Sequence, residues 1–210
     1  MPSEQRTRRH LTMLRDFSAA DLITLANGFA GTGSILATLQ YMDTRDHRIL
    51  WLAFALLPAA MVFDVLDGRV ARWRQRSTLL GRELDSLADL ISFGVAPAVL
   101  AFAVGIRGAW DALVLVYFVS CGLSRLARYN VTAAELADAS GKVRYFEGTP
   151  IPTTLVLVAL LALLTWLDRI DQNLPFGVIR LLGGAFHPLV LLFVLSGTAM
   201  ISKTLRVPKL

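Results

Sequence analysis

Residues 64–89 read DVLDGRVARWRQRSTLLGRELDSLAD and place four aspartates, Asp64, Asp67, Asp85 and Asp89, beside strongly apolar sequence. A carboxylate in the interior of a bilayer costs at least about 2.5–3.5 kcal/mol. Four carboxylates are therefore unfavourable in such sequence unless a cation neutralises them. This stretch also contains a helix end, a turn and a helix start, so it joins two helices that bring the acidic pairs together.

The sequence on both sides of this stretch is apolar enough to cross a membrane. The chain is 55% hydrophobic with a mean hydropathy of +0.56, and several runs reach the roughly 20 residues that a transmembrane helix needs. We expect an all-α, polytopic integral membrane protein, with one membrane domain over residues 18–210 that follows a juxtamembrane segment, 1–17. The six predicted spans are 18–42, 49–72, 80–105, 109–129, 151–168 and 177–201.

The distribution of basic residues predicts the orientation of these spans. With the N-terminus inside, sixteen of the 21 Lys and Arg residues lie on the cytoplasmic side, as the positive-inside rule requires. Both termini and the acidic stretch are then cytoplasmic at the inner membrane. Residues 4–16 mix Arg with apolar residues and predict a short amphipathic helix on that surface. The positive charge is explained by topology and membrane lipids, so no nucleic-acid partner is expected.

The spacing of the acids points to a metal site. Asp64 and Asp67 are three residues apart, and Asp85 and Asp89 are four apart, so each pair shares one helix face. Hard divalent cations prefer carboxylate oxygens and retain water or phosphate ligands. Without His or Cys in the cluster, Mg²⁺ or Mn²⁺ is favoured over zinc, and two such ions can clamp a pyrophosphate.

Small and basic residues accompany the acids. Gly68, Ala71 and Gly81 leave room for a ring or a phosphate to approach the backbone, and Arg72 offers a forked donor to phosphate. Two structural alternatives remain open for individual residues. An aspartate can pair with a neighbouring arginine, and the glycines can serve close helix packing alone.

The pattern Asp64-x2-Asp67-Gly68-x2-Ala71-Arg72-x8-Gly81-x3-Asp85-x3-Asp89 resembles, at every fixed position, the signature of the CDP-alcohol phosphotransferase family. The resemblance implies a six-helix membrane enzyme, often a homodimer, that transfers a phosphatidyl group from a CDP-lipid to an alcohol and releases CMP. It implies that the four aspartates hold metal and that Asp89 is the general base. It also implies that three small residues line the nucleotide pocket: Gly68, Ala71 and Gly81.

Three longer stretches resemble the subgroup of that family that uses serine as the acceptor, the integral-membrane phosphatidylserine synthases of bacteria. These stretches are LDSLADLISFGVAPA at 84–98, GLSRLARYN at 122–130 and FEGTPIP at 146–152, in which Thr149 replaces an expected apolar residue. The stretch LITLANGFAG at 22–31 is similar to the first helix of the subgroup. The similarity implies that two of its residues face the nucleotide: Thr24 and Asn27.

A serine acceptor needs a cation for its carboxylate. Arg125 and Arg128, three residues apart at the predicted cytoplasmic end of a span, can bind it bidentately, and Asn130 can orient the ammonium or a phosphate. The alternative is that both arginines are topological anchors that reach to lipid head groups. We therefore expect transfer from CDP-diacylglycerol to L-serine, with Asp89 taking the hydroxyl proton.

Two other functions remain possible at this stage. The first is the same reaction with another acceptor, such as glycerol phosphate or inositol phosphate, or with an archaeal-type CDP-lipid. The second is a divalent-cation transporter that uses the same carboxylates. A transporter would need polar residues along a path through several spans, and the predicted outer halves of the spans hold few of them.

Overall fold

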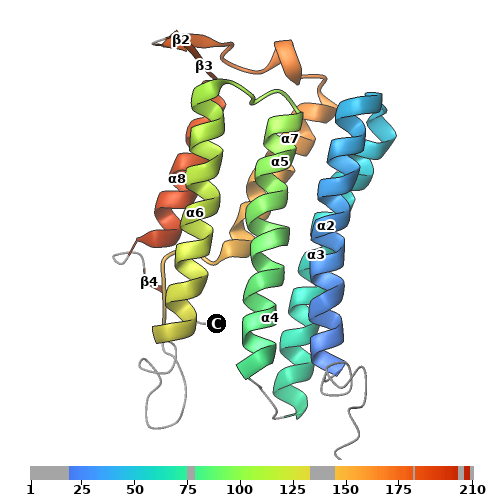
Figure 1. Cartoon of the computed structure of the whole chain (residues 1–210), viewed down its shortest axis with the longest axis vertical. Helices are drawn as coiled ribbons and strands as arrows, with labels where there is room; N and C mark the ends of the chain where they lie inside the picture. The colour runs from blue at the N-terminus through green and yellow to red at the C-terminus, as the bar shows by residue number, and fades with distance from the viewer. Residues whose placement is uncertain (1–18, 75–78, 133–144, 182, 203–205, 209–210) are drawn as a thin grey trace, which may run out of the picture.

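The computed structural model describes residues 19–74, 79–132, 145–181, 183–202 and 206–208. Long helices run side by side along the vertical axis of Figure 1, and a small β-hairpin lies across one end of the bundle. The α-helices are α2 (Ala19–Thr44), α3 (His47–Arg74), α4 (Leu79–Asp89), α5 (Ala96–Ala103), α6 (Ala109–Thr132), α7 (Leu155–Trp166) and α8 (Leu191–Ile201).

Shorter elements connect these helices. A π-helical segment, η1 (Leu90–Val95), joins α4 to α5 without a break, and 3-10 turns cover Ile151–Thr154, Asp171–Asn173 and Pro188–Val190. Two antiparallel strand pairs complete the described chain. They are β1 (Tyr145–Glu147) with β4 (Arg206–Pro208), and β2 (Ile179–Leu181) with β3 (Gly184–Phe186).

Four helical segments are long and apolar enough to cross a membrane: Ala20–Thr44, His47–Val70, Leu80–Ala103 and Ala109–Val131. They correspond to the first four predicted spans, and the chain is a multi-pass, mainly helical membrane protein. The apolar helices Ile151–Trp166 and Pro188–Ile201 are shorter than the other four. Among the described residues, four apolar helical segments thus reach spanning length and two are shorter, so the prediction of six full spans is not confirmed.

The prediction of one continuous helix over 177–201 is wrong in its first part. Residues 179–181 and 184–186 pair as the β2–β3 hairpin, and α8 begins only at Leu191. Gly183 takes a positive φ of 80° at the turn, Pro188 starts the 3-10 turn that leads into α8, and the hairpin packs on Trp110 of α6. The expected surface helix over residues 4–16 lies outside the described residues.

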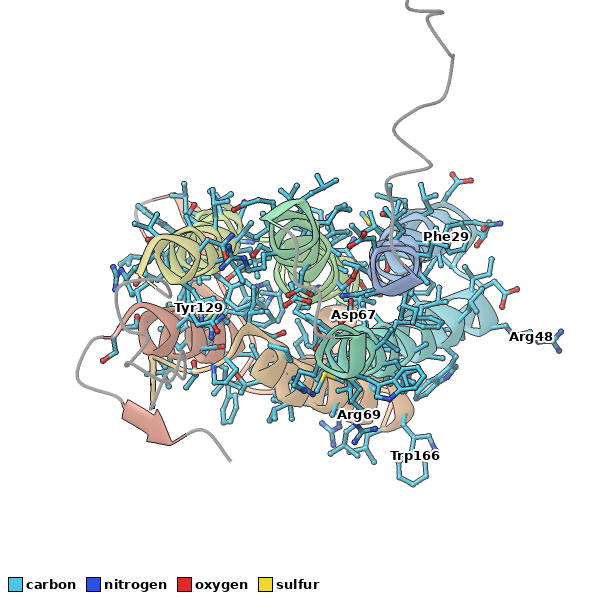
Figure 2. All side chains as sticks on the ribbon, turned by 90° about the horizontal axis from the view of Figure 1, so that it is seen from below. Phe29, Arg48, Asp67, Arg69, Tyr129 and Trp166 are labelled. Atoms are coloured by element: carbon cyan, nitrogen blue, oxygen red, sulfur yellow. The ribbon has the colours of Figure 1, made fainter. Side chains whose placement is uncertain are left out.

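The bundle surrounds one apolar core and presents apolar side chains outward. Phe118 on α6 and Phe193 on α8 are fully buried and meet edge to face with ring centroids 5.2 Å apart. Phe29 and Trp166 are 81% and 73% exposed, and both point away from the bundle in Figure 2. Exposed aromatic and aliphatic side chains are the expected surface of helices that contact lipid. The single cysteine, Cys121, is buried and free, as predicted.

Candidate active site

The two acidic pairs lie on adjacent helices and face each other. Asp64 and Asp67 come from the last turns of α3, and Asp85 and Asp89 from α4. One carboxylate oxygen from each of Asp64, Asp67 and Asp85 lies within 4.8 Å of the other two. Figure 2, drawn along the bundle, places Asp67 among the helices, whereas Arg69 points outward. The predicted convergence of the acids is therefore present for three of the four.

Asp89 lies beside this group of three acids and is not part of it. Its side chain is 8% exposed, compared with 5% for Asp67. Asp64 and Asp85 are its strongest electrostatic neighbours. Asn27 on α2 donates from Nδ2 to Asp89 Oδ1 at 3.1 Å. One oxygen of Asp89 thus receives a hydrogen bond from α2.

Helix α2 contributes a second polar row to the site. Thr24 donates from Oγ1 to Asp67 Oδ2 at 2.5 Å, and Asn27, three residues later, donates to Asp89. Thr24 and Asn27 were predicted to face the nucleotide, and the structure places both against the acids. The sequence analysis missed Asp21, a 4% exposed carboxylate within electrostatic range of Asp67. The i, i+3 spacing of Asp21 and Thr24 was the available signal.

The donor set fits a hard divalent cation. The three converging ligand atoms are all carboxylate oxygens, which Mg²⁺ and Mn²⁺ prefer. Asp85 Oδ1 is buried and has no hydrogen-bond partner among the described residues. A buried carboxylate oxygen without a partner is costly, and a bound cation satisfies it. The acidic cluster can therefore hold a divalent metal ion.

The π-helical segment η1 begins directly after Asp89 and is braced by three polar or small residues. Ser92 donates from Oγ to the backbone oxygen of Asn27 at 3.1 Å. The close approach is possible because Gly31 lacks a side chain, since a Cβ there would lie 2.8 Å from the Ser92 Cα. Thr154 donates from Oγ1 to the Phe93 oxygen at 2.7 Å. Interrupted helices of this kind are frequent at functional sites.

Small residues border the acids on α3. A Cβ at Gly68 would meet only Arg72 among the described residues, at 3.6 Å from its Nη1. Gly68 therefore lies beside a guanidinium group and leaves space next to Asp67. Ala71 follows on the same helix, and Gly81 lies on α4, one turn before Asp85. That Gly68, Ala71 and Gly81 line a nucleotide pocket stays a prediction.

The residues predicted for the acceptor lie on α6 and differ in their surroundings. Arg125 lies within electrostatic range of Asp89, and its Nε is buried without a hydrogen-bond partner in the part of the chain that the structure describes. Asn130 donates from Nδ2 to Ser86 Oγ at 3.0 Å and to Glu83 Oε2 at 3.3 Å, both on α4. Arg125 is thus directed to the acidic site, whereas Asn130 joins α6 to α4.

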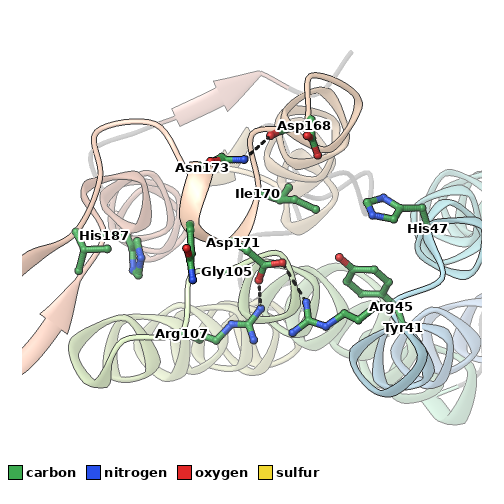
Figure 3. Close-up of a pocket in the computed structure, with 12 residues that line it drawn as sticks. Tyr41, Arg45, His47, Gly105, Arg107, Asp168, Ile170, Asp171, Asn173 and His187 are labelled. Atoms are coloured by element: carbon green, nitrogen blue, oxygen red, sulfur yellow. Dashed lines mark hydrogen bonds and ion pairs between the residues drawn. The ribbon is translucent and has the colours of Figure 1, made fainter.

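A separate cavity of about 800 Å³ lies at the opposite end of the bundle (Figure 3). Asp171 accepts from Arg45 Nη1 at 3.0 Å and from Arg107 Nη2, and its backbone N–H donates to the Val104 oxygen at 2.7 Å. Hydrogen bonding to Tyr41 and the Asp171 carboxylate raise the pKa of Arg45. Asp171 thus pairs with both arginines, and these contacts connect three loops at this end of the bundle.

Comparison with known proteins places most of the chain in one family. Residues 17–196 match the family described as CDP-alcohol phosphatidyltransferase. The CDP-diacylglycerol–serine O-phosphatidyltransferase of Saccharomyces cerevisiae is 49% identical over 205 residues, which are 95% of this chain and 74% of the relative. The protein of the same name from Helicobacter pylori strain J99 is 37% identical over 169 residues, 78% of this chain and 66% of the relative.

An archaeal relative shares the same region. The archaetidylserine synthase of Methanothermobacter thermautotrophicus is 36% identical over 142 residues, which are 66% of this chain and 55% of the relative. The chain spans about three quarters of the yeast relative, and about half to two thirds of the other two. Serine appears in the first two names, and the third names a serine-containing lipid.

Proposed function

The chain belongs to the CDP-alcohol phosphatidyltransferase family, and on that premise we propose that it transfers a phosphatidyl group from CDP-diacylglycerol to the hydroxyl of L-serine, giving phosphatidylserine and CMP. The observation that carries the proposal is the convergence of three carboxylates within 4.8 Å, beside a buried fourth, Asp89. Serine as the acceptor is supported by the relatives that carry it in their names.

The proposed cofactor is Mg²⁺ or Mn²⁺, as two ions. Asp64, Asp67 and Asp85 would hold the first ion, because their oxygens converge. A bound divalent ion supplies positive charge that neutralises a pyrophosphate and stabilises its leaving oxygen. That Asp89 is also a metal ligand stays a prediction. Its place outside the three-acid group and its donor from Asn27 favour the role of general base.

The proposed chemical step is an in-line displacement. The serine hydroxyl oxygen attacks the lipid-linked phosphorus, the hydroxyl proton passes to Asp89, and the bond from that phosphorus to the bridging oxygen breaks. CMP leaves with the electron pair of that bond. Because Asn27 occupies Oδ1 of Asp89, Oδ2 is the oxygen that accepts the proton. General base catalysis of this kind contributes about 10²–10⁴-fold, and positioning the two reactants contributes further.

The remaining predicted residues bind the two substrates. Gly68, Ala71 and Gly81 line the nucleotide pocket, where Arg72 donates to phosphate. Arg125 binds the serine carboxylate, which its buried, unpartnered Nε supports. Arg128 and Asn130 are secondary candidates for this pocket, since Asn130 already bonds to α4. Thr24 and Asn27 contact the nucleotide through the side of the site that α2 forms.

The proposed setting is the inner membrane, with the acidic site and both termini on the cytoplasmic face. The bias of Lys and Arg toward that side supports the orientation. The lipid tails of CDP-diacylglycerol then stay in the bilayer while its head group reaches the acids. A homodimer is proposed from the family resemblance alone.

The direct test is an assay of the purified protein in detergent micelles or vesicles. CDP-diacylglycerol, isotopically labelled serine and Mn²⁺ or Mg²⁺ should yield labelled phosphatidylserine and an equal amount of CMP. Removing the divalent ion with a chelator should stop the reaction, and adding it back should restore it. A variant with Asp89→Asn is the matched inactive control, because it retains the size and polarity of the side chain.

The same assay separates the alternatives. Product with glycerol 3-phosphate or inositol phosphate, and none with serine, would overturn the serine assignment and leave the reaction type intact. Faster turnover with an ether-linked archaeal CDP-lipid than with CDP-diacylglycerol would reassign the donor lipid. That comparison of donor lipids is needed because an archaetidylserine synthase is 36% identical to this chain over 142 residues.

A further inference from the structure

The β2–β3 hairpin and the loop before it expose a set of large apolar side chains. Phe176 is 80% exposed, Val178 54%, Ile179 50% and Leu181 56%. Ile179 and Leu181 are two residues apart on β2 and share one face, while Arg180 between them points to the other. An apolar group of this size on an exposed hairpin marks an interaction surface.

This hairpin is held in a fixed position on α6. Trp110 donates from Nε1 to the Leu181 oxygen at 2.8 Å, and its ring lies so close to Gly184 that a Cβ there would come within 2.7 Å. The backbone N–H of His187 donates to Asp111 Oδ1 at 2.8 Å where the hairpin ends. The exposed apolar side chains are therefore presented by an anchored element.

The backbone before β2 directs an aromatic ring outward at a conformational cost. Phe176 has a φ of 69°, followed by Gly177 with a φ of 64°. A positive φ is ordinary for glycine, but it is an outlier for a bulky residue such as phenylalanine. Strained residues of this kind cluster at functional positions. In water, an exposed phenyl ring makes no contact that would offset this strain.

The place of the hairpin in the bundle identifies its partner. Trp51 near the start of α3, Trp110 at the start of α6 and Trp166 at the end of α7 all lie at the end of the bundle that carries the hairpin. Tryptophan is enriched where a membrane meets water. Figure 1 shows β2 lying across this end, above α6 and opposite the end where α4 begins.

The lengths of α7 and α8 also bear on the position of the hairpin relative to the membrane. With the 3-10 turns that precede α7 and α8, the two apolar helical segments are Ile151–Trp166 and Pro188–Ile201, and both are shorter than the four spanning helices. The hydrocarbon core of a bilayer is about 30 Å thick. The segments next to these short helices then share the thickness of the bilayer, and the hairpin between α7 and α8 is one of them.

We propose that the loop and hairpin at residues 176–181 and 183–186 insert Phe176, Ile179 and Leu181 into the head-group region of the leaflet opposite the acidic site. Arg180, on the other face of the strand, then reaches lipid phosphates at the surface. The partner is the lipid surface itself. This inference depends on membrane insertion of the bundle and is independent of the identity of the acceptor alcohol.

Site-specific fluorescence in vesicles tests the proposal. Because Cys121 is the only cysteine and is buried, a C121A background permits single labels at F176C and L181C. The polarity-sensitive fluorophore NBD, attached at either site, should emit at shorter wavelength in vesicles than in denaturant, and lose emission to nitroxide-bearing lipids. The matched control is Q172C, on the exposed polar 3-10 turn near the hairpin, which aqueous iodide should quench instead.

Two outcomes would overturn the proposal. Quenching of the Phe176 and Leu181 labels by iodide, to the same degree as at Gln172, would show that the hairpin lies in water. Protection from both quenchers, with energy transfer between donor- and acceptor-labelled copies, would show that a second copy of the chain covers it. Turnover of CDP-diacylglycerol by each labelled variant verifies the fold, and its retention alongside iodide quenching would reject the hairpin proposal alone.

Discussion

Asn27 on α2 donates a hydrogen bond of 3.1 Å to Asp89 on α4, although 62 positions separate them in the sequence. One turn earlier on α2, Thr24 donates to Asp67 on α3 at 2.5 Å. One helix therefore holds an acid from each of the two acidic pairs. Hydrogen bonds from α2 thus position carboxylates of both α3 and α4. Several consequences of this arrangement can be measured.

Replacing the proposed base should abolish chemistry and leave substrate binding intact. We expect Asp89→Asn to lower turnover by about 10²–10⁴-fold, because the amide does not accept the serine proton. Binding of a CDP-lipid, measured by its protection of the protein against thermal aggregation, should persist. Unchanged turnover in this variant would remove Asp89 from the role of general base.

Removing a converging carboxylate should weaken metal binding before it affects the fold. We expect Asp85→Asn to raise the Mn²⁺ concentration needed for half-maximal activity by at least about tenfold, as typical of changes around a metal. Electron paramagnetic resonance of free Mn²⁺ measures binding without any turnover. The control is Asp171→Asn, which removes an acid at the distal end. Equal Mn²⁺ affinity in the wild type and Asp85→Asn would contradict the assignment.

The two arginines of α6, Arg125 and Arg128, should differ in their effect on the KM for serine. Arg125→Ala removes a half-buried cation from the side of Asp89. We expect the KM for serine to rise by about 10–100-fold, since hydrogen bonds to charged groups contribute roughly 1.5–3 kcal/mol. The KM for CDP-diacylglycerol should change little. Arg128→Ala is the matched variant, and we expect a smaller effect. A larger serine effect at Arg128 would transfer the carboxylate site to that residue.

The close contact between α2 and η1 should be intolerant of one methyl group. A Cβ at Gly31 would lie 2.8 Å from the Ser92 backbone, so we expect Gly31→Ala to destabilise the fold by about 1–3 kcal/mol through overpacking. Gly33→Ala is the control, because its Cβ would meet only the tip of Leu56, at 3.4 Å. Thermal unfolding in detergent measures both, and equal melting temperatures would refute the contact.

The ion pairs at the distal end should matter for stability and not for catalysis. Asp171 pairs with Arg45 and Arg107, whose side chains are 48% and 33% exposed. Exposed pairs contribute about 0–1 kcal/mol each, so Asp171→Asn should lower the melting temperature slightly, and less so at high salt. Its turnover should equal that of the wild type. A large loss of activity would give the distal cavity a catalytic role that its geometry does not suggest.

Local patterns in the sequence predicted the helical membrane class, the first four spans and the meeting of α3 and α4. These features follow from apolar run length and from i, i+3 and i, i+4 spacing, both of which are local properties of a helix. The choice of carboxylates likewise predicted a hard divalent cation. Asp64, Asp67 and Asp85 converge as their spacing required.

The sequence did not reveal the features that depend on contacts between distant segments. The β2–β3 hairpin replaced the start of a predicted helix, because its apolar residues suit either structure, and the turn at Gly183 and the packing on Trp110 favour the strand pair. The π-helical segment after Asp89 depends on Ser92 and Thr154 finding partners on α2 and within η1.

The sequence by itself thus singled out the four aspartates as candidates for the chemistry, because carboxylates in apolar sequence are costly wherever the chain places them. Only the tertiary structure decided how those aspartates are arranged and which donors they receive. Three acids converge, and Asp89 stands beside them with Asn27 on one oxygen. That difference arises from the packing of α2 against α3 and α4, and the spacing of acids within one stretch does not encode which donor from another helix each acid receives.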